Sequence, residues 1–305
     1  MNLSINPWYY CNFRCHFCYL TPEQLGDRKL LDLERLNEML SEVMMYDSVD
    51  HVDLYGGEIA LLPDYYLEEL KLCLESYGID SVNINTNLSA INEAMFDPYY
   101  HISVSYDFTV REQHDKVWRN MALLPVQFSV LMLASDRLIT EDVDNMIQQF
   151  NLLPNLTSVE IKPYSENQSN SLNVSFKDYE EFVKQWIISP VEKKFDFINE
   201  YLIQDVLDKK GNSFSDDHVY ITPSGRWAVL EFDLNDKEYF LEYDTFDQYL
   251  IWTRLEKERV ANNKFCNSCE YYGHCLSEHL REVKDLDNSC NGFKLLIDWY
   301  AHRSN

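Results

Sequence analysis

Three cysteines lie close together near the start of the chain, in the stretch YYCNFRCHFCYL. Cys11, Cys15 and Cys18 are separated by three residues and then by two. Thiolates this close together can hold a metal, but a structural zinc site takes four ligands, and this loop offers no obvious fourth. Around a four-iron cluster, three cysteines leave one iron without a protein ligand, so that a small molecule can chelate it. The residues alone therefore allow a zinc site or a reactive iron–sulfur cluster.

A second cysteine group lies near the other end of the chain. Cys266, Cys269 and Cys275 fall in CNSCEYYGHC, and Cys290 follows in NSCNGF. Four thiolates fill every ligand position of a tetrahedral metal or of a closed four-iron cluster, and their spacing does not distinguish zinc from iron. The remaining cysteine, Cys73, falls on the apolar stripe of an expected helix, so we interpret it as a core thiol.

Composition restricts the class of protein and of partner. The chain has 305 residues, of which 46% are hydrophobic, enough for one large domain or two ordinary ones. Its net charge of −25 repels phosphate backbones and anionic lipid headgroups, so we expect neither nucleic acid nor a membrane as a partner. An acidic surface suits a basic peptide or protein, although it also serves solubility alone. The start MNLSINPWYY lacks the features of a signal peptide, and no stretch approaches the ~20 apolar residues of a spanning helix. We therefore expect a cytoplasmic protein with reduced thiols.

Apolar and polar segments alternate in a strand-then-helix order through the first half of the chain. We expect strands near residues 2–7, 50–55, 81–87, 101–106, 127–133 and 157–162. Helical patterns fall near residues 21–47, 63–77, 89–96, 110–123 and 138–151. This alternation predicts an α/β fold with a parallel sheet wrapped by helices. Further along, HVYITPSGRWAVLEFD predicts a hairpin that turns at PSG.

One face of every expected strand is polar. Leu3 and Ile5 are apolar, whereas Ser4 and Asn6 on the other face are polar, and the later strands repeat this alternation. Ordinary parallel strands are apolar on both faces, because helices or core cover both. The pattern therefore predicts a curved sheet whose concave face is open and polar, forming a cavity for a sizeable polar substrate.

The first cysteine group resembles the signature of the radical S-adenosylmethionine (radical SAM) enzymes. The spacing matches, an aromatic residue, Phe17, precedes Cys18, and the group follows the first expected strand. The resemblance implies a partial (β/α)6 TIM-like barrel, which we place at residues 1–175. It also implies a [4Fe–4S] cluster on the three cysteines and S-adenosylmethionine (SAM) chelated to it, with Phe17 packed against the adenine.

The segment YGGE, after the second expected strand, resembles the part of these enzymes that receives the amino group of SAM. It contains Gly56, Gly57 and Glu58. Glycines let a backbone approach closely, and a carboxylate offsets the charge of an ammonium.

Two further segments, NINTNLS and ISVSYDF, resemble cofactor-contacting strand ends and contain Asn87 and Ser105. Leu88 and Phe108 stand in them where glycine is usual. HDKVWR then resembles a following His-Asp…Arg run, which makes Arg119 the expected partner of the SAM carboxylate, although its spacing from Ser105 is shifted. The alternative for Asn87 is that it only solvates the cavity.

The end of the chain resembles the SPASM or twitch extension of many radical SAM enzymes. We place a helical connection at residues 176–212 and a small SPASM/twitch-like domain at residues 213–305. Leu230 and His279 stand where full SPASM domains have further cysteines. The resemblance thus implies one auxiliary [4Fe–4S] cluster on the second cysteine group, distant from SAM, that relays electrons or serves as scaffold. A structural zinc knuckle is the alternative.

The resemblance implies that a 5′-deoxyadenosyl radical abstracts a hydrogen atom from a substrate in the cavity. Asp107, Glu160 and Lys162, at its rim, are candidate catalytic residues that orient the substrate or move a proton. The extension is commonest in enzymes that modify peptides, so we expect a ribosomally made peptide as substrate and a crosslink, an oxidation or a backbone excision as the reaction.

Because the chain starts directly at the first strand, we expect a separate peptide-recognition protein or direct reading of the peptide leader. We also expect a one-electron donor such as flavodoxin or ferredoxin. Two alternatives stay open, namely a radical dehydrogenase that acts on a sugar or alcohol and a zinc-binding interaction protein.

Overall fold

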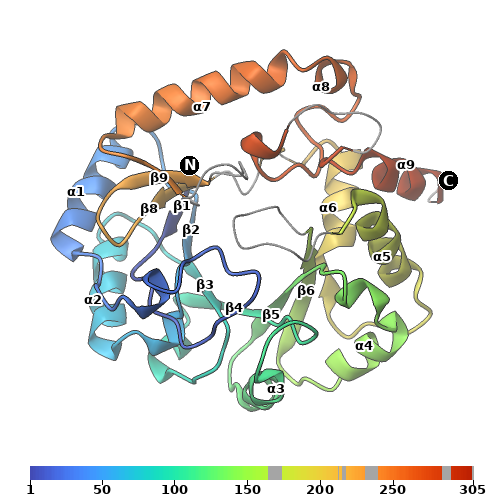
Figure 1. Cartoon of the computed structure of the whole chain (residues 1–305), viewed down its shortest axis with the longest axis horizontal. Helices are drawn as coiled ribbons and strands as arrows, with labels where there is room; N and C mark the ends of the chain where they lie inside the picture. Colours follow the sequence, from blue (N-terminus) through green and yellow to red (C-terminus); the bar gives the residue numbers. More distant parts are fainter. Residues whose placement is uncertain (164–173, 212, 215–217, 231–239, 284–289, 304–305) are drawn as a thin grey trace.

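The computed structural model describes residues 1–163, 174–211, 213–214, 218–230, 240–283 and 290–303. Its strands are β1 (Asn2–Ile5), β2 (His51–Leu54), β3 (Val82–Thr86), β4 (Tyr100–Ser105), β5 (Phe128–Leu133), β6 (Leu156–Lys162), β7 (Asp196–Phe197), β8 (Val219–Ile221), β9 (Trp227–Leu230) and β10 (Phe240–Tyr243). They form one curved sheet in the order β10-β9-β8-β1-β2-β3-β4-β5-β6-β7 (Figure 1). The strands from β8 through β1 to β7 are parallel to one another, whereas β9 is antiparallel to both β8 and β10. The expected parallel sheet of a partial TIM-like barrel is confirmed.

The α-helices are α1 (Leu33–Met44), α2 (Asp64–Glu75), α3 (His114–Leu123), α4 (Val143–Phe150), α5 (Phe176–Ile188), α6 (Ile198–Leu207), α7 (Phe246–Ala261), α8 (Lys264–Ser268) and α9 (Lys294–Arg303). Short 3-10 turns are η1 (Gln24–Gly26), η2 (Ile59–Leu61), η3 (Glu93–Phe96), η4 (Leu138–Thr140) and η5 (Leu280–Glu282). Helices α1 to α6 lie around the outside of the curved sheet (Figure 1).

The alternation of residue types along the strands sets the two faces of the sheet. Leu3 and Ile5 of β1, like the matching residues of β2 to β6, are buried beneath the helices. The polar residues between them fall into rows, because parallel strands align residue by residue. One such row runs from Ser4 through Asp53 and Asn83 to His101. The expected polar concave face is therefore present.

Two of the expected helices are shorter in the structure. The segment expected near 21–47 divides into η1 and α1, because Asp32 caps α1: its carboxylate accepts the N–H groups of Glu34 at 2.8 Å and Arg35 at 3.4 Å. The segment expected near 89–96 forms only η3.

The sheet crosses both boundaries that we expected between domains. Strand β7 lies within the expected helical connection and extends the sheet beside β6. The hairpin of β8 and β9 lies in the expected C-terminal domain, yet β8 pairs with β1. Its turn contains Gly225 at a φ of +77°, a conformation that L side chains rarely adopt. Strands from the C-terminal part thus belong to the barrel sheet. The division into a barrel, a helical connection and a C-terminal domain stays a proposal.

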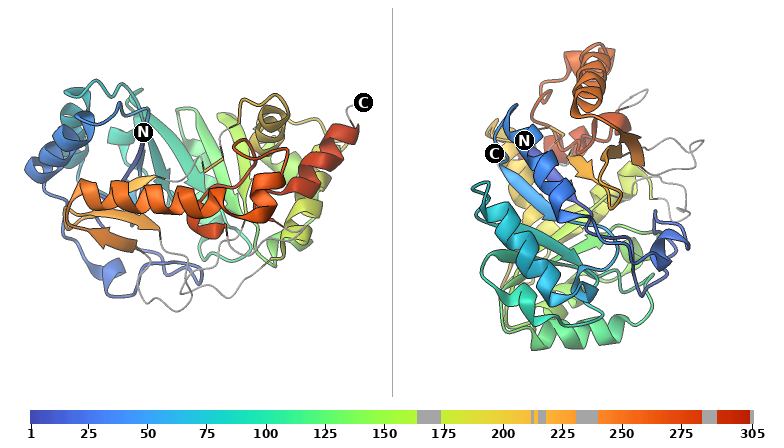
Figure 2. Two further views of the ribbon diagram at one scale, coloured as in Figure 1. Left: turned by 90° about the horizontal axis from the view of Figure 1, so that it is seen from above. Right: turned by 90° about the vertical axis from the view of Figure 1, so that its left-hand side faces the viewer.

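The rest of the C-terminal part lies across the open side of the sheet (Figures 1 and 2). Helix α7 packs on β9 and β10, and α9 packs on α5 and α6 at the opposite edge. A capping box formed by Thr245 and Gln248 starts α7. Residues from the end of the chain thereby reach the cavity.

One buried side chain supports the edge of β6 beyond the point where β7 ends. Asn199 accepts the N–H of Ile161 at 2.8 Å and donates to the carbonyl of Ile161 at 2.8 Å. It also donates to the hydroxyl of Tyr179 at 3.1 Å. The side chain thus takes the place of a neighbouring strand next to Glu160 and Lys162.

We expect Asn199→Leu to lower the free energy of unfolding by about 1–3 kcal/mol, because the buried N–H of Ile161 loses its acceptor while its carbonyl keeps only the hydroxyl of Tyr179. Urea unfolding measures this. The matched control is Gln148→Leu on the exposed face of α4, which should change stability by less than about 0.5 kcal/mol. Equal losses in the two variants would show that Asn199 does not support the strand.

Candidate functional site

The concave face of the sheet encloses a cavity of about 480 Å³. This volume lies in the range of about 300–1,000 Å³ that is typical of sites for small molecules and cofactors. Twelve of the residues that we singled out for the barrel line it together: Cys11, Cys15, Phe17, Cys18, Gly56, Gly57, Glu58, Asn87, Ser105, Asp107, Glu160 and Lys162. The carboxyl ends of the strands meet at one edge of the sheet, which brings segments distant in sequence to one place.

The first cysteine group lies in the loop that follows β1. Cys11 is buried, and its sulfur receives the N–H of Phe13 at 3.4 Å and the side-chain amide of Asn87 at 3.5 Å. The N–H of Cys18 donates to the carbonyl of Cys15 at 3.1 Å, which closes the loop. Asn87 thus contacts the cysteine group. The alternative role that we gave it, solvation of the cavity alone, does not include this contact.

Burial controls the ionisation of these thiols. It raises the pKa of Cys11 to about 12 and that of Cys18 to about 11. Burial also raises the pKa of Cys15, and the nearby Arg111 guanidinium opposes this rise. Without a metal the thiols therefore keep their protons at neutral pH. A positively charged metal centre would displace the protons and bind the thiolates.

The Gly-Gly-Glu segment packs directly against the start of the cysteine loop. Gly57 donates its N–H to the carbonyl of Trp8 at 3.1 Å, and Glu58 donates its N–H to the carbonyl of Tyr10 at 2.8 Å. A Cβ atom on Gly57 would lie 2.1 Å from the carbonyl oxygen of Tyr10. Only glycine permits this approach, because both partners are backbone.

Glu58 is fully buried and its carboxylate is held by donors. It accepts the N–H of Ala60 at 2.9 Å, the N–H of Asn87 at 2.7 Å and the hydroxyl of Thr86. Burial raises the pKa of Glu58, and these hydrogen bonds oppose the rise. A carboxylate offers about four acceptor positions, so roughly one is left for a further donor in the cavity. Its place and charge fit the ammonium group of an amino acid.

Arg111 is the cation on this wall, and sequence analysis missed it. Its guanidinium lies 2.9 Å from the carboxylate of Asp107, donates to the carbonyl of Ser105 at 2.5 Å and lies 5.4 Å from the ring centre of Phe17. The side chains of Arg111 and Asp107 are 8% and 2% exposed, so the pair is desolvated. Burial raises the pKa of Asp107, and Arg111 opposes the rise. Asp107 also accepts the N–H of Leu133 at 2.8 Å.

The structure does not bring Arg119 to the cavity. Arg119 is exposed on α3, whereas Arg111 precedes that helix and reaches the cavity from the loop after β4. Asp107 and Arg111 follow an expected strand and are four residues apart. This spacing is the signal that could have identified Arg111.

Glu160 and Lys162 meet a residue of the C-terminal part at the rim. The ammonium of Lys162 lies 3.3 Å from the carboxylate of Glu160 and 2.8 Å from that of Glu278. Sequence analysis did not single out Glu278. Its neighbour His279 also lines the cavity. The rim is therefore built by both ends of the chain.

The cysteines of the second group line one small cavity of their own, together with the aromatic rings of Phe265 and Tyr271. The four are Cys266, Cys269, Cys275 and Cys290. Burial raises the pKa of Cys266 to about 11, and the neighbouring thiols raise it further. The hydroxyl of Ser213 lies 3.1 Å from the sulfur of Cys275, and a Cβ on Gly292 would lie 2.9 Å from it. The four thiols can therefore surround a common centre.

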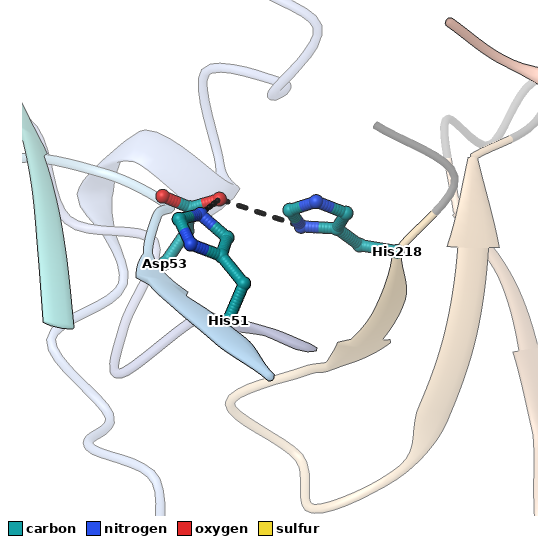
Figure 3. Close-up of side chains that lie close together, drawn as sticks. All are labelled: His51, Asp53 and His218. Atoms are coloured by element: carbon teal, nitrogen blue, oxygen red, sulfur yellow. Dashed lines mark hydrogen bonds and ion pairs between the residues drawn. The ribbon is translucent and has the colours of Figure 1, made fainter. Parts of the chain in front are cut away.

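One further group of metal-binding side chains lies on the wall of the main cavity. His51, Asp53 and His218 each place a ligand atom within 4.8 Å of the other two (Figure 3). Across the described ranges no cysteine belongs to a group that tight. Sequence analysis did not identify this group, because His218 joins it only through the pairing of β8 with β1.

Residues 5–121 match the family model described as the Radical SAM superfamily. A curated protein of Sulfolobus acidocaldarius, "Probable GTP 3',8-cyclase", is 34% identical over 86 residues, which are 28% of this chain and 26% of that protein. The match thus spans about a quarter of that relative. No helix in the described residues has the length and apolar character that crossing a bilayer requires.

The fold resembles two kinds of solved structure over nearly all of this chain. The structure of anSMEcpe with bound AdoMet has a TM-score of 0.72 and 16% identity, covering 99% of this chain and 97% of that one. Streptococcus suis SuiB bound to precursor peptide SuiA has a TM-score of 0.63 and 16% identity, covering 95% and 75%. At this identity the likeness concerns the fold.

We expect Gly57→Ala to displace the cysteine loop, because its Cβ would meet backbone atoms of Tyr10. The free energy of unfolding should fall by about 3 kcal/mol or more, and iron bound by the first cysteine group should be lost. Thermal unfolding and iron analysis measure the two effects. Gly26→Ala is the matched control, since nothing lies within 4 Å of its added Cβ. Full iron binding by Gly57→Ala would contradict the role of this contact.

Proposed function

We propose that the chain is a radical SAM enzyme that modifies a ribosomally made peptide, since residues 5–121 match the Radical SAM superfamily model. The observation that carries this proposal is a polar cavity that has the cysteine loop on its wall and residues of the C-terminal part on its rim. When bound, the reduced [4Fe–4S] cluster and SAM together supply the 5′-deoxyadenosyl radical that abstracts a hydrogen atom.

The residues of the cavity suit the holding of SAM next to such a cluster. Cys11, Cys15 and Cys18 would ligate three irons and leave the fourth open. Glu58 would accept the ammonium of SAM at its remaining acceptor position. Phe17, under the Arg111 guanidinium, offers a flat face to the adenine.

The salt bridge from Arg111 to Asp107 organises this wall. It neutralises Arg111 in a desolvated place, so we assign Asp107 a positioning role in place of the catalytic role that we expected. Arg111 replaces Arg119 as the proposed partner of the SAM carboxylate, because it is the arginine that lines the cavity. Glu160 and Lys162 stay the proposed groups for orienting the substrate or moving a proton, now with Glu278 beside them.

We assign an auxiliary [4Fe–4S] cluster to the second cysteine group. Four thiols around one cavity suit a closed cluster, which relays electrons or serves as scaffold. A single zinc ion with Zn–S bonds of about 2.3 Å would bring its sulfurs to about 3.8 Å from one another. In the described residues neither cysteine group is gathered that closely, which favours iron clusters over the zinc-binding alternative.

A peptide substrate has two kinds of support. The cavity is polar and large enough for a side chain with its flanking backbone. The fold also resembles SuiB bound to precursor peptide SuiA and anSMEcpe with bound AdoMet and Kp18Cys peptide. A separate peptide-recognition protein and a flavodoxin or ferredoxin as electron donor complete the proposal.

Variants of the cysteines test the assignment of the two clusters. After anaerobic reconstitution, we expect about eight irons per chain. Replacing Cys11, Cys15 and Cys18 with alanine should remove about four of them and abolish the formation of 5′-deoxyadenosine. Replacing Cys266, Cys269, Cys275 and Cys290 should also remove about four while uncoupled SAM cleavage continues.

The control for these variants is Cys73→Ala, which changes a thiol that lines neither cavity. It should keep all of the iron and the activity. SAM cleavage by the variant without Cys11, Cys15 and Cys18 would refute the proposed cofactor site.

The substrate is tested by finding a short reading frame beside the gene and by making the peptide that it encodes. We expect the reconstituted enzyme, with SAM and a low-potential reductant, to change the mass of this peptide, and tandem mass spectrometry to place the change on one or two residues. Omission of SAM is the control. An unchanged peptide together with the oxidation of a sugar or alcohol would replace this proposal with the small-molecule dehydrogenase.

A further inference from the structure

We propose that His51, Asp53 and His218 bind a divalent transition-metal ion of the zinc class on the wall of the cavity, apart from both cysteine groups. The same carboxylate oxygen of Asp53 lies near a ring nitrogen of both histidines, and Figure 3 shows it facing His218. The three residues come from β2 and from the residue that precedes β8, two strands that flank β1.

The separations of the ligand atoms suit one ion. The Asp53 carboxylate oxygen is 3.2 Å from Nε2 of His51 and 3.4 Å from Nδ1 of His218. Two ligands of a tetrahedral zinc ion, each about 2.0–2.1 Å from the metal, lie about 3.3–3.4 Å apart. Charge-assisted hydrogen bonds are shorter, at about 2.7–2.9 Å. Both distances match those between ligands of one metal. The His218 distance is longer than the usual range of about 2.7–3.2 Å for an N–H···O hydrogen bond, whereas the His51 distance also fits a hydrogen bond.

Two polar side chains lie beside the same imidazole nitrogens. The side-chain amide of Asn83 lies 3.3 Å from Nε2 of His51, and the hydroxyl of Ser4 lies 2.9 Å from Nδ1 of His218. An imidazole nitrogen without a proton has a single lone pair, so it either accepts from such a donor or binds a metal. A metal ion would therefore replace these two contacts, and it would neutralise the carboxylate of Asp53, which only accepts.

The three side chains differ in exposure, so the expected ion is open to the cavity on one side. The side chains of His218 and Asp53 are 6% and 16% exposed, whereas that of His51 is 42% exposed. All three line the main cavity. Two imidazoles and one carboxylate are the ligand set of open zinc and iron(II) sites, which keep positions for water or substrate. Its further ligand is therefore an oxygen atom from the cavity.

The group lies away from the cysteine loop along the strands. His51 opens β2, and Gly56 follows the carboxyl end of that strand. With a rise of about 3.3 Å per residue, the two are roughly 16 Å apart. An ion here would hold a carbonyl or carboxylate of the substrate at the far end of the cavity. This substrate role rests on the proposed function, whereas the metal site itself does not.

Zinc retention by the holoenzyme tests the site. The enzyme with iron on both cysteine groups is equilibrated with zinc, passed over a desalting column and analysed for zinc per chain. We expect about one tightly held zinc ion, with only nitrogen and oxygen neighbours at about 2.0–2.1 Å in the zinc-edge X-ray absorption spectrum. Zinc competes well with iron(II) for such ligands.

Two substitutions should weaken zinc binding by at least tenfold. Asp53→Asn removes the charge and keeps the shape, and His51→Ala changes a half-exposed side chain that the fold tolerates. His101→Ala is the matched control, because His101 lies in the same row of the sheet, lines the cavity and is not a member of the group. It should retain zinc as the unchanged enzyme does.

Three results would overturn the metal site. These are sulfur neighbours at about 2.3 Å in the spectrum, zinc retention by Asp53→Asn and His51→Ala equal to that of the unchanged enzyme, and no retained zinc at all. The last result would leave the three residues as a hydrogen-bonded relay. None of these measurements uses SAM or a peptide, so a failure of this inference is distinct from a failure of the proposed function.

Discussion

The contact between Gly57 and the backbone of Tyr10 is the constraint on which the cavity depends. Two chain segments approach there more closely than any side chain would allow, and the hydrogen bonds on either side of the contact keep the segments in register. The same segment ends in Glu58, whose carboxylate receives the N–H of Asn87, and the amide of Asn87 reaches the sulfur of Cys11. The loop after β2 thereby contacts the loops after β1 and β3, so the cysteine group is supported by the ends of three strands.

Electrostatics at this wall depends on partners that are buried together. Arg111 and Asp107 would each be costly to bury alone, and as a desolvated pair they stabilise each other. For the thiols burial is the largest effect, and the Arg111 guanidinium opposes it only in part at Cys15 and Cys18, so burial raises their pKa values. The wall is therefore prepared to exchange protons for a metal centre while its arginine and aspartate stay charged.

The C-terminal part contributes to the main cavity as well as to its own cysteine site. Glu278 reaches Lys162 on β6, and His218 reaches Asp53 on β2. Pairing of β8 with β1 brings His218 to the wall near β2, and Glu278 reaches the cavity at β6, four strands further along the sheet. A substrate in the cavity would thus contact residues from both ends of the chain.

The sequence by itself determined the parallel strands, their polar face, the two cysteine groups and the Gly-Gly-Glu segment. These features are local, because period-two alternation and short spacings are written in consecutive residues. Only the tertiary structure decided that Arg111 and not Arg119 lines the cavity, that Glu278 completes the rim and that His218 joins His51 and Asp53. Each of these depends on strand order, on a loop conformation or on packing between distant segments. Such contacts arise from the burial of whole faces, which no short stretch of residues encodes.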